Sequence, residues 1–280
     1  MNLRPVSTKW SSYKIDGVLV WVKRDDLCSP SVDDCPSFGK IRGLYAFLSK
    51  LPQGSVVGVL DTGHSQGGWA TAYYCNLMGL RCINYYPVYK RELGKPDKGY
   101  PGAHKIRRLQ LKAWALDAEL RSLKAGMSAV LFNIAKKQLR EEFLGATMVP
   151  NGLKLLETIK ETAVEMESFP GPMASGDGTM IISASTATVA AGVKAGLDRL
   201  GFKGEFIVHL GYSRPTSRVR EKFAGDNIRI IDEGYTYADE AKGIEAPFPC
   251  NKYYDLKAWK WLVGNVTELK RPVAFWNVGS

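Results

Sequence analysis

The residues of this sequence best suited to chemistry are a lysine, a serine, a hydroxyl-rich turn and an aspartate. Lys40 opens a segment with helical spacing, and a lysine amine forms imine bonds and exchanges them with other amines. Ser65 lies in a glycine-rich turn, residues 183–188 are rich in serine and threonine, and Asp255 follows two tyrosines near the C-terminus. A nucleophile, an anion-binding turn and a carboxylate together indicate an enzyme.

The turn around Ser65 matches the nucleophile elbow of α/β-hydrolases. Residues 63–67 read Gly-His-Ser-Gln-Gly, the pattern G-x-S-x-G, with a predicted strand before it and a predicted helix after it. A hydrolase would use Ser65 as nucleophile and take an acid and a histidine from later in the chain, such as Asp198 and His209. The elbow comes early, which leaves little room for the strands and the oxyanion-hole loop of a hydrolase. A serine hydrolase is therefore an alternative function.

A second interpretation uses three segments together. Residues 23–27 read KRDDL, residues 38–44 read FGKIRGL, and residues 63–68 form the glycine-rich turn. In this order they resemble the fold-type II enzymes that depend on pyridoxal 5'-phosphate (PLP). The nearest branch is that of 1-aminocyclopropane-1-carboxylate (ACC) deaminase and D-cysteine desulfhydrase. The resemblance runs nearly end to end, and it implies a two-lobed α/β fold with open, mostly parallel, twisted sheets flanked by helices.

The resemblance implies specific roles for Lys40 and for the glycine-rich turn. Lys40 falls at the lysine that forms the internal aldimine with PLP and later moves the substrate proton. Ser65 and Gln66 align with the turn that contacts the pyridoxal ring and the substrate carboxylate, although the family usually has asparagine where this chain has Gln66. His64 either reaches the substrate or is a plain turn residue. For Lys40 the alternative is an ordinary solvated lysine at the start of a helix.

The resemblance also implies a phosphate site. Six residues between a predicted strand and a predicted helix fall at the family's Gly-Ser-Gly-Gly-Thr position: Ser183, Ala184, Ser185, Thr186, Ala187 and Thr188. Backbone N–H groups at a helix N-terminus bind phosphate, and the hydroxyl side chains here add donors where the glycines are missing. A simple serine or threonine N-cap would produce the same pattern.

Asp255 falls, by the same resemblance, at the position that faces the pyridine nitrogen. A carboxylate there keeps the nitrogen protonated, so that the ring can hold a carbanion as a quinonoid. This indicates a lyase that acts at the alpha carbon of an amino-acid group, by decarboxylation, deamination or elimination. The alternative is an aspartate that caps a helix.

Three tyrosines match those that the deaminase branch places around its substrate. Tyr254 and Tyr235 are the candidates for catalysis and Tyr237 is a candidate substrate contact, although core packing accounts for tyrosines equally well. The segment 275–279, FWNVG, resembles the final strand of the family, with Val278 in place of a hydroxyl residue. That replacement fits the contact of Asp255 with the ring nitrogen.

The charge of the chain favours a phosphate-bearing substrate. The 280 residues include 38 Lys+Arg and 28 Asp+Glu, a net charge of +10, which attracts polyanions. Residues 89–112 contain eight basic and two acidic residues, and Arg107 and Arg108 are candidates to contact a nucleotide or a DNA strand. One hypothesis is an amino-acid group attached to a nucleobase, as in the thymidine hypermodification pathways of some bacteriophages, which include a PLP-dependent decarboxylase. The alternative is a free small amino acid and an incidental basic surface.

Composition and short signals narrow the class of protein. Hydrophobic residues make up 45% and charged residues 24% of the chain, which excludes collagen-like, disordered and coiled-coil proteins. The N-terminus lacks an apolar signal core, and the five cysteines include no C-x-x-C pair. We expect a cytoplasmic protein, in the host cytoplasm if a phage encodes it, with no metal and no membrane contact. The family implies a homodimer, and a non-catalytic relative that binds nucleic acid is a further alternative.

The pattern along the chain predicts alternating strands and helices. Strands are expected at residues 56–60, 81–86, 146–149, 179–183, 205–210 and 228–232, and helices at 69–78, 153–166, 188–200 and 218–223. The basic segment is expected to become helical and to continue towards Leu123. Residues 1–41 and 150–280 are expected to form a large PLP-binding domain, with residues 42–149 as a small domain inserted in it.

Overall fold

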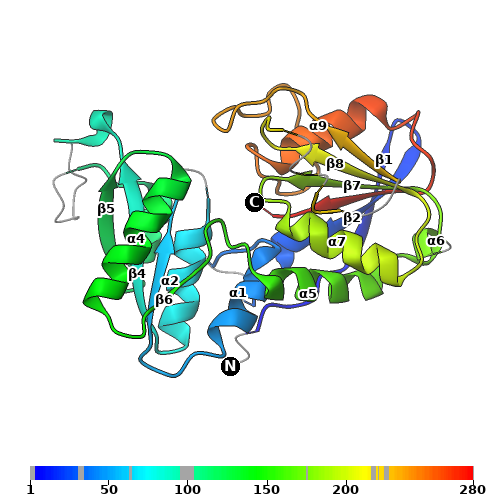
Figure 1. The fold of residues 1–280 in the computed structure, drawn as a ribbon. Coiled ribbons are helices and arrows are strands. Elements are labelled where there is room, and N and C mark those ends of the chain that lie inside the picture. Colours follow the sequence, from blue (N-terminus) through cyan, green and yellow to red (C-terminus); the bar gives the residue numbers. More distant parts are fainter. Residues whose placement is uncertain are drawn as a thin grey trace. The chain divides into compact units, whose positions relative to one another are not determined.

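Figure 1 shows the fold as a computed structural model, which describes residues 4–30, 35–62, 65–94, 104–174, 176–215, 219, 221–223 and 227–279. The chain divides into two compact units. The large unit comprises Met1–Val32, Ser37–Gly43 and Leu155–Ser280, and the small unit comprises Asp33–Pro36 and Leu44–Lys154. The chain passes from the large to the small unit within helix α1 (Lys40–Leu48).

A six-stranded sheet forms the centre of the large unit, in the order β1-β2-β10-β7-β8-β9. The first pair, β1 and β2, is antiparallel, and the other neighbouring pairs are parallel. The strands are β1 (Trp10–Ile15), β2 (Val18–Arg24), β7 (Thr179–Ala184), β8 (Glu205–Leu210), β9 (Ile228–Ile231) and β10 (Val273–Asn277). Parallel strands covered on both faces require nearly continuous apolar runs, and β7 and β8 are buried along almost their whole length.

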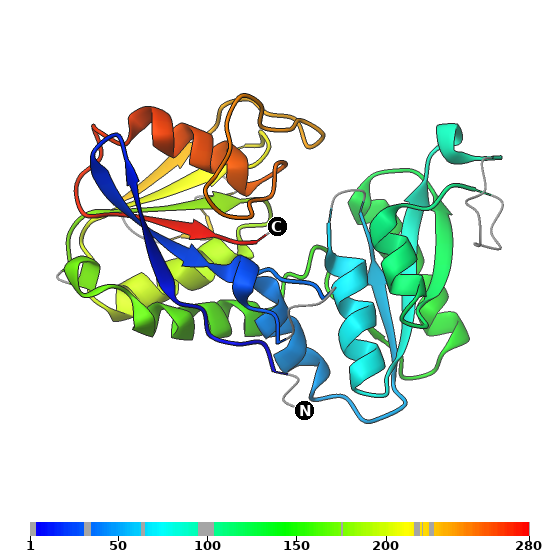
Figure 2. The same ribbon diagram turned by 180° about the vertical axis from the view of Figure 1, so that it is seen from behind.

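Helices cover both faces of this sheet (Figures 1 and 2). Two of them lie on one face and the third on the other: α5 (Leu156–Glu165) and α7 (Thr188–Arg199), opposite α9 (Asp255–Asn265). Because successive side chains of a strand point to opposite faces, Ile182 packs in the core on the α7 side, whereas Ile181 packs with Trp259 of α9. The large unit is therefore a three-layer α/β structure.

The small unit contains a parallel four-stranded sheet in the order β5-β4-β3-β6. Its strands and helices are β3 (Val56–Leu60), α2 (Gly67–Leu77), β4 (Arg81–Val88), α3 (Arg108–Trp114), β5 (Glu119–Lys124), α4 (Ser128–Glu142) and β6 (Thr147–Met148). Leu60, Ile83 and Leu123 of the sheet pack against Leu131 and Leu139 of α4. These residues form a separate hydrophobic core for the small unit.

The connections that follow β7 and β8 lie at the same edge of the large sheet. The two strands are parallel neighbours, so their carboxyl ends lie side by side, which is the place where open α/β sheets bind ligands. Residues 185–187 lead from β7 into α7, and residues 211–215 follow β8. The shorter helical turns are η1 (Asp25–Leu27), η2 (Lys90–Glu92), η3 (Met166–Ser168) and α6 (Gly171–Ala174).

Most predicted elements are present, with one clear error. The strands predicted at residues 56–60 and 205–210 agree with β3 and β8. The helix predicted to continue towards Leu123 is wrong, because α3 ends at Trp114 and residues 119–124 form β5, parallel to β4. Asp117, with a left-handed φ of 61°, separates the two elements. Of the helix predicted at 218–223, the structure describes residues 219 and 221–223, and residues 221 and 222 form a turn instead of a helix.

The described residues offer neither a membrane span nor a metal site. No helix among them combines the length and the apolar character that crossing a membrane requires. In the same part of the chain, no group of three or more His, Cys, Asp or Glu side chains is placed to hold a metal ion. None of the five cysteines is joined in a disulfide: Cys28, Cys35, Cys75, Cys82 and Cys250.

Candidate active site

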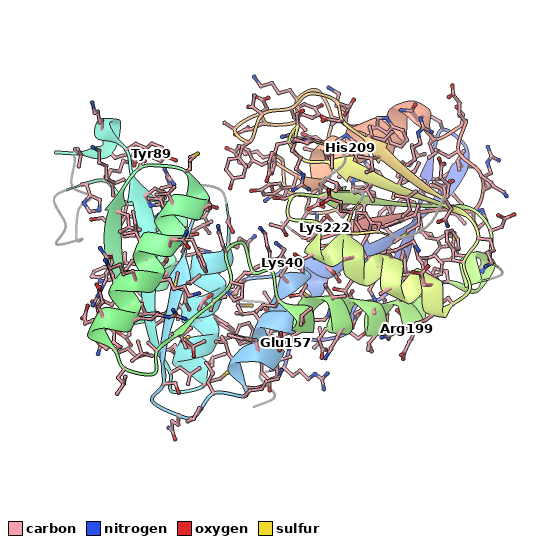
Figure 3. All side chains as sticks on the ribbon, in the orientation of Figure 1. Lys40, Tyr89, Glu157, Arg199, His209 and Lys222 are labelled. Carbon is pink, nitrogen blue, oxygen red and sulfur yellow. The ribbon has the colours of Figure 1, made fainter. Side chains whose placement is uncertain are left out.

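Lys40 lies against the turn that precedes α7. It is the first residue of α1, and its Nζ donates a hydrogen bond of 3.0 Å to Oγ1 of Thr186. Thr186 Oγ1 is in turn 3.1 Å from Oγ1 of Thr188, the first residue of α7. Figure 3 shows Lys40 near the start of α7. The structure therefore brings the predicted nucleophilic amine to the predicted phosphate-binding turn, across 146 positions of sequence.

The turn between β7 and α7 has the features of an anion site. Ala187 has a left-handed φ of 61°, a conformation that costs a residue with a side chain roughly 1–2 kcal/mol. Such strain clusters at functional sites. Ser183 Oγ is buried and has no hydrogen-bond partner among the described residues. The N–H groups of the first turn of α7 lack partners within the helix, so they favour an anion at this end.

Asp255 is a buried carboxyl group that has no cationic partner. It begins α9, is 2% exposed, and forms no ion pair with the described residues. Its Oδ1 accepts a long hydrogen bond, 3.4 Å, from the backbone N–H of Val278. Burial raises the pKa of Asp255 well above its usual value, and the nearby carboxylates of Asp25 and Asp26 raise it further. A cationic N–H group beside this carboxyl would restore its ionised form.

Val278 connects Asp255 to the residue before Lys40. The Val278 carbonyl oxygen accepts a 2.7 Å hydrogen bond from the N–H of Gly39, while its own N–H points to the Asp255 carboxylate. The backbone around Lys40 and the buried carboxyl group are thus held by one residue of the C-terminal segment. Val278 contributes these contacts through its backbone, so the replacement of a hydroxyl side chain leaves them in place.

The buried residues of the KRDDL segment pack against the backbone that precedes Lys40. Asp25 is fully buried, and its carboxylate accepts hydrogen bonds of 2.8 Å from Trp276 Nε1 and 2.8 Å from Arg42 Nη2. A Cβ atom added at Gly39 would lie 2.5 Å from Asp25 Oδ2, so the chain before Lys40 rests directly on this carboxylate. Lys23 forms a buried ion pair of 2.7 Å with Glu165. The segment thus acts as a buried support for Gly39.

Three tyrosines and a lysine line the carboxyl ends of β8 and the start of α9. The hydroxyl of Tyr254 donates to that of Tyr237 at 3.1 Å, and burial raises the pKa of Tyr254. Lys257 is fully buried and donates 2.6 Å to the carbonyl of Gly211. The same ammonium lies 4.6 Å from the ring centroid of Tyr235, and burial lowers the pKa of Lys257. Lys257 therefore joins the segment after β8 to α9.

The small unit holds the remaining predicted site residues. Ser65 Oγ accepts a 3.1 Å hydrogen bond from the N–H of Gly67, and Gln66, at the N-cap of α2, has a buried Oε1 without a partner among the described residues. His64 lies outside the described residues. Arg107 forms a 3.2 Å ion pair with Glu92, whereas Arg108 is exposed at the start of α3. The substrate roles of these residues stay predictions.

The triad considered for a serine hydrolase does not form. His209 Nε2 lies 2.8 Å from Glu233 Oε2, and Asp198 pairs with Lys194 instead of a histidine. Burial lowers the pKa of His209. Ser65 Oγ is engaged as an acceptor within its own turn. The acid–histidine pair of Asp198 and His209 that such a triad requires is therefore not formed.

Two residues at this edge of the large sheet were absent from the sequence-based candidates. Arg214 Nη2 donates to the carbonyl of Ala184 at 3.3 Å, and Lys222 Nζ donates to the carbonyl of Thr186 at 2.9 Å. Both basic side chains therefore reach the turn before α7, and Figure 3 shows Lys222 beside it. The signal that points to Arg214 is its place directly after a buried parallel strand, where ligand-binding residues gather.

These residues fit PLP. An amine at Lys40, an orphaned buried hydroxyl at Ser183, and donors at the start of α7 match the aldehyde and the phosphate of the cofactor. The buried, unpaired Asp255 matches a protonated pyridine nitrogen, which would supply the cation that the described residues do not. These residues thus provide a partner for the phosphate of the cofactor and for its protonated ring nitrogen.

Comparison with known proteins agrees with this fit. The chain is 43% identical, over 292 aligned residues, to the glycyl-dTMP PLP-dependent decarboxylase of Pseudomonas phage M6, with 100% of this chain and 99% of that protein covered. The fold resembles that of an ACC deaminase homologue, with a TM-score of 0.75 and 17% identity over 100% of this chain and 91% of the other. O-ureido-L-serine synthase has a TM-score of 0.65 and 14% identity, with 96% and 87% covered. No protein-family model matches the chain.

The likeness to solved structures confirms the predicted α/β fold class, and the full-length identity to the phage protein confirms the predicted kind of enzyme and its cofactor class. This chain therefore belongs to the family of PLP-dependent decarboxylases that includes the glycyl-dTMP decarboxylase of Pseudomonas phage M6, built on the fold-type II scaffold.

Proposed function

We propose that this chain removes carbon dioxide from the amino-acid group of glycyl-dTMP, with PLP held at Lys40. The observation that carries the proposal is the 43% identity to a protein of that activity over the whole chain. The contact of Lys40 with Thr186, and the buried carboxyl group of Asp255, support it from the structure.

PLP, when bound, withdraws electrons from the alpha carbon of an amino acid. The residues of this chain would hold it in place: Lys40 by its amine, the 183–188 turn by its N–H and hydroxyl donors, and Asp255 by a charge-assisted hydrogen bond to the ring nitrogen. The bond from the alpha carbon to the carboxylate breaks and its electron pair stays on the alpha carbon. Carbon dioxide leaves, and a proton from Lys40 Nζ takes its place.

The remaining candidates contribute to the substrate side of this proposal. Ser65, Gln66 and His64 receive the carboxylate end of the amino-acid group, and Tyr254 and Tyr235 lie beside the reacting carbon. Arg107 and Arg108 provide positive charge for the nucleotide. Of these, Arg107 has the weakest support, because Glu92 already neutralises it.

We further propose a homodimer that works in the cytoplasm of the host bacterium. The family resemblance supports the dimer, and the phage source of the relative supports the location. Light scattering of the purified chain at micromolar concentration measures the oligomeric state, and a monomer would contradict the proposed dimer. The substrate is either the mononucleotide or the same group within a DNA strand, and both forms enter the assay below.

The test incubates the PLP-loaded chain with glycyl-dTMP, or with an oligonucleotide that contains it, and follows the products by mass spectrometry. The proposal expects loss of carbon dioxide with the amine retained. It also expects Lys40→Ala to abolish both the turnover and the visible absorption of the lysine-bound cofactor.

Lys203→Ala is the matched control, because this lysine is exposed in the same unit. It is expected to keep both the colour and the activity. Release of ammonia with the carboxylate retained, or a chain that takes up no PLP, would contradict the proposal.

A further inference from the structure

A strip of four neighbouring side chains runs from Tyr254, beside Asp255, to Arg214, whose guanidinium reaches the Ala184 carbonyl at the turn before α7. The ring centroids of Tyr254 and Tyr237 are 6.2 Å apart, and those of Tyr237 and Tyr212 are 5.6 Å apart. The guanidinium of Arg214 then lies 5.3 Å from the Tyr212 ring centroid. We call these residues the tyrosine–arginine strip; all belong to the large unit.

One end of the strip lies at the proposed cofactor site. Tyr254 immediately precedes Asp255, and a Cβ atom added at Gly211 would lie 3.2 Å from the Tyr254 ring and 3.7 Å from Ser183 Oγ. Gly211 therefore packs closely against the Tyr254 ring, near the orphaned hydroxyl of Ser183.

The other end of the strip carries a positive charge that no described carboxylate neutralises. Arg214 forms no ion pair in the described part of the chain, and its Nε is buried without a hydrogen-bond partner there. Its one described hydrogen bond, to the carbonyl of Ala184, leaves further guanidinium N–H groups for a ligand. Arginine stacked on an aromatic ring is a preferred partner of phosphate. Lys222, whose Nζ donates to the Thr186 carbonyl, adds positive charge nearby.

The segment that carries the strip is anchored. Ser213 donates its N–H to the carbonyl of Tyr235 at 2.7 Å and its hydroxyl to Asp232 at 2.8 Å. Lys257 holds the carbonyl of Gly211. Tyr212 and Arg214 are therefore presented from a backbone that is bound on both sides, which reduces the entropy lost when a ligand binds.

Tyrosine faces at one end and an arginine at the other match the two parts of a pyrimidine nucleoside monophosphate. Aromatic side chains bind nucleobases by stacking, and guanidinium binds phosphate in a bidentate manner. We infer that Tyr212 and Tyr237 bind the pyrimidine of the substrate and that Arg214 binds its 5'-phosphate. This inference rests on the proposed function, and it assigns to the large unit a contact that sequence reasoning sought at Arg107 and Arg108.

The experiment titrates the PLP-loaded chain with dTMP and, separately, with thymidine, by calorimetry. Arg214→Gln is expected to raise the Kd for dTMP at least about tenfold, the effect of losing a charge-assisted hydrogen bond. It leaves the Kd for thymidine within about twofold, because thymidine has no phosphate. Tyr212→Ala weakens both ligands, whereas Tyr212→Phe keeps the ring and the affinity.

Arg199→Gln is the matched control, since Arg199 is an exposed arginine at the opposite end of α7. It is expected to leave both affinities unchanged. The inference is overturned if Arg214→Gln leaves dTMP binding unchanged or weakens dTMP and thymidine equally. It is also overturned if the variant raises the Kd for PLP instead, which would assign Arg214 to the cofactor phosphate.

The outcome separates this inference from the proposed function. Binding of dTMP that depends on Arg214, in a chain that releases no carbon dioxide, upholds the nucleotide site and refutes the decarboxylase. Release of carbon dioxide with an unchanged KM for glycyl-dTMP in Arg214→Gln upholds the decarboxylase and refutes the nucleotide site.

Discussion

The Nζ of Lys40 and the Oγ1 of Thr186 lie 3.0 Å apart, joining the first turn of α1 to the loop that precedes α7. Two lysines converge on this threonine, because Lys222 Nζ also donates to its backbone carbonyl at 2.9 Å. Thr186 thus positions the amine of Lys40 through its side chain and accepts a second cation through its main chain. A hydroxyl in this place orients the lysine without neutralising it, as a carboxylate would.

Thr186→Val removes the hydroxyl and keeps the shape of the side chain. We expect the Kd for PLP to rise about tenfold or more, because this hydroxyl is one of the donors proposed for the cofactor phosphate and a hydrogen bond to a charged group contributes roughly 1.5–3 kcal/mol. Titration of the visible cofactor band measures this Kd. Thr186→Ser retains the oxygen and is expected to bind PLP as the wild type does. Equal weakening in both variants would refute the role of the hydroxyl.

Asp255→Asn separates the function of this carboxyl group from its structural effect. In the PLP-loaded chain we expect kcat to fall about 100-fold or more, within the range seen when a positioned acid–base group is lost. The cofactor-free chain becomes more stable at neutral pH, because burial raises the pKa of Asp255 and an uncharged amide avoids that cost.

Turnover assays and denaturant unfolding of the same preparation measure the two effects. Asp16→Asn, at an exposed aspartate in the turn between β1 and β2, is the control for both. A fall in stability together with a normal kcat would show that Asp255 has a structural role only.

Gly39→Ala tests the close packing of the residue before Lys40 against the Asp25 carboxylate. The added Cβ would lie 2.5 Å from Asp25 Oδ2, and this carboxylate cannot move freely because Trp276 and Arg42 hold it. We expect a loss of about 1–3 kcal/mol in the free energy of unfolding, as for other overpacked sites. Urea denaturation provides the measurement.

Gly264→Ala is the contrasting variant. Gly264 is in α9, and a Cβ atom there has no atom within 4 Å. Alanine is expected to stabilise the chain by about 0.5–1 kcal/mol, because glycine loses more backbone entropy in a helix. If both alanine variants change stability in the same direction, the contact between Gly39 and Asp25 does not constrain the fold.

Asp61 makes the stability of the chain depend on pH. Burial raises its pKa from 3.8 to about 7, although hydrogen bonds from the backbone of Thr62 and Gly68 oppose the rise. Between these two values the folded state holds a proton that the unfolded state has lost, so the free energy of unfolding falls as pH rises from about 4 to about 7. The total effect of this group is roughly 4 kcal/mol at most.

Asp61→Asn is expected to remove this slope, because the amide does not titrate and its oxygen can still accept the N–H of Thr62. Unfolding free energies at a series of pH values, wild type minus variant, measure it. Asp117→Asn, an exposed aspartate of the small unit, is expected to keep the slope. A difference that is constant across the series would mean that Asp61 is ionised throughout.

The features that could be predicted from the sequence are those that depend on residues close together along the chain. The apolar runs of β3 and β8 carry their own signal, because strands covered on both faces need continuous apolar residues. The turn before α7 stands out because it lies between an apolar run and a helical one, whereas Lys40 stands out through the FGKIRGL motif around it. β5 escaped prediction because its partner, β4, lies 36 positions earlier in the sequence (Ile83 pairs with Glu119), and pairing rather than local propensity decides it.

The sequence by itself determined the α/β fold class, the family and the position of Lys40, since each rests on short motifs read in order. Only the tertiary structure decided what surrounds these residues. It buried Asp255 with no cationic partner among the described residues, paired Arg107 with Glu92, and gave Arg214 a place beside Tyr212 where no described carboxylate pairs with it. Charge and hydrogen bonding depend on side chains that meet through long-range packing, and burial then sets the strength of each interaction.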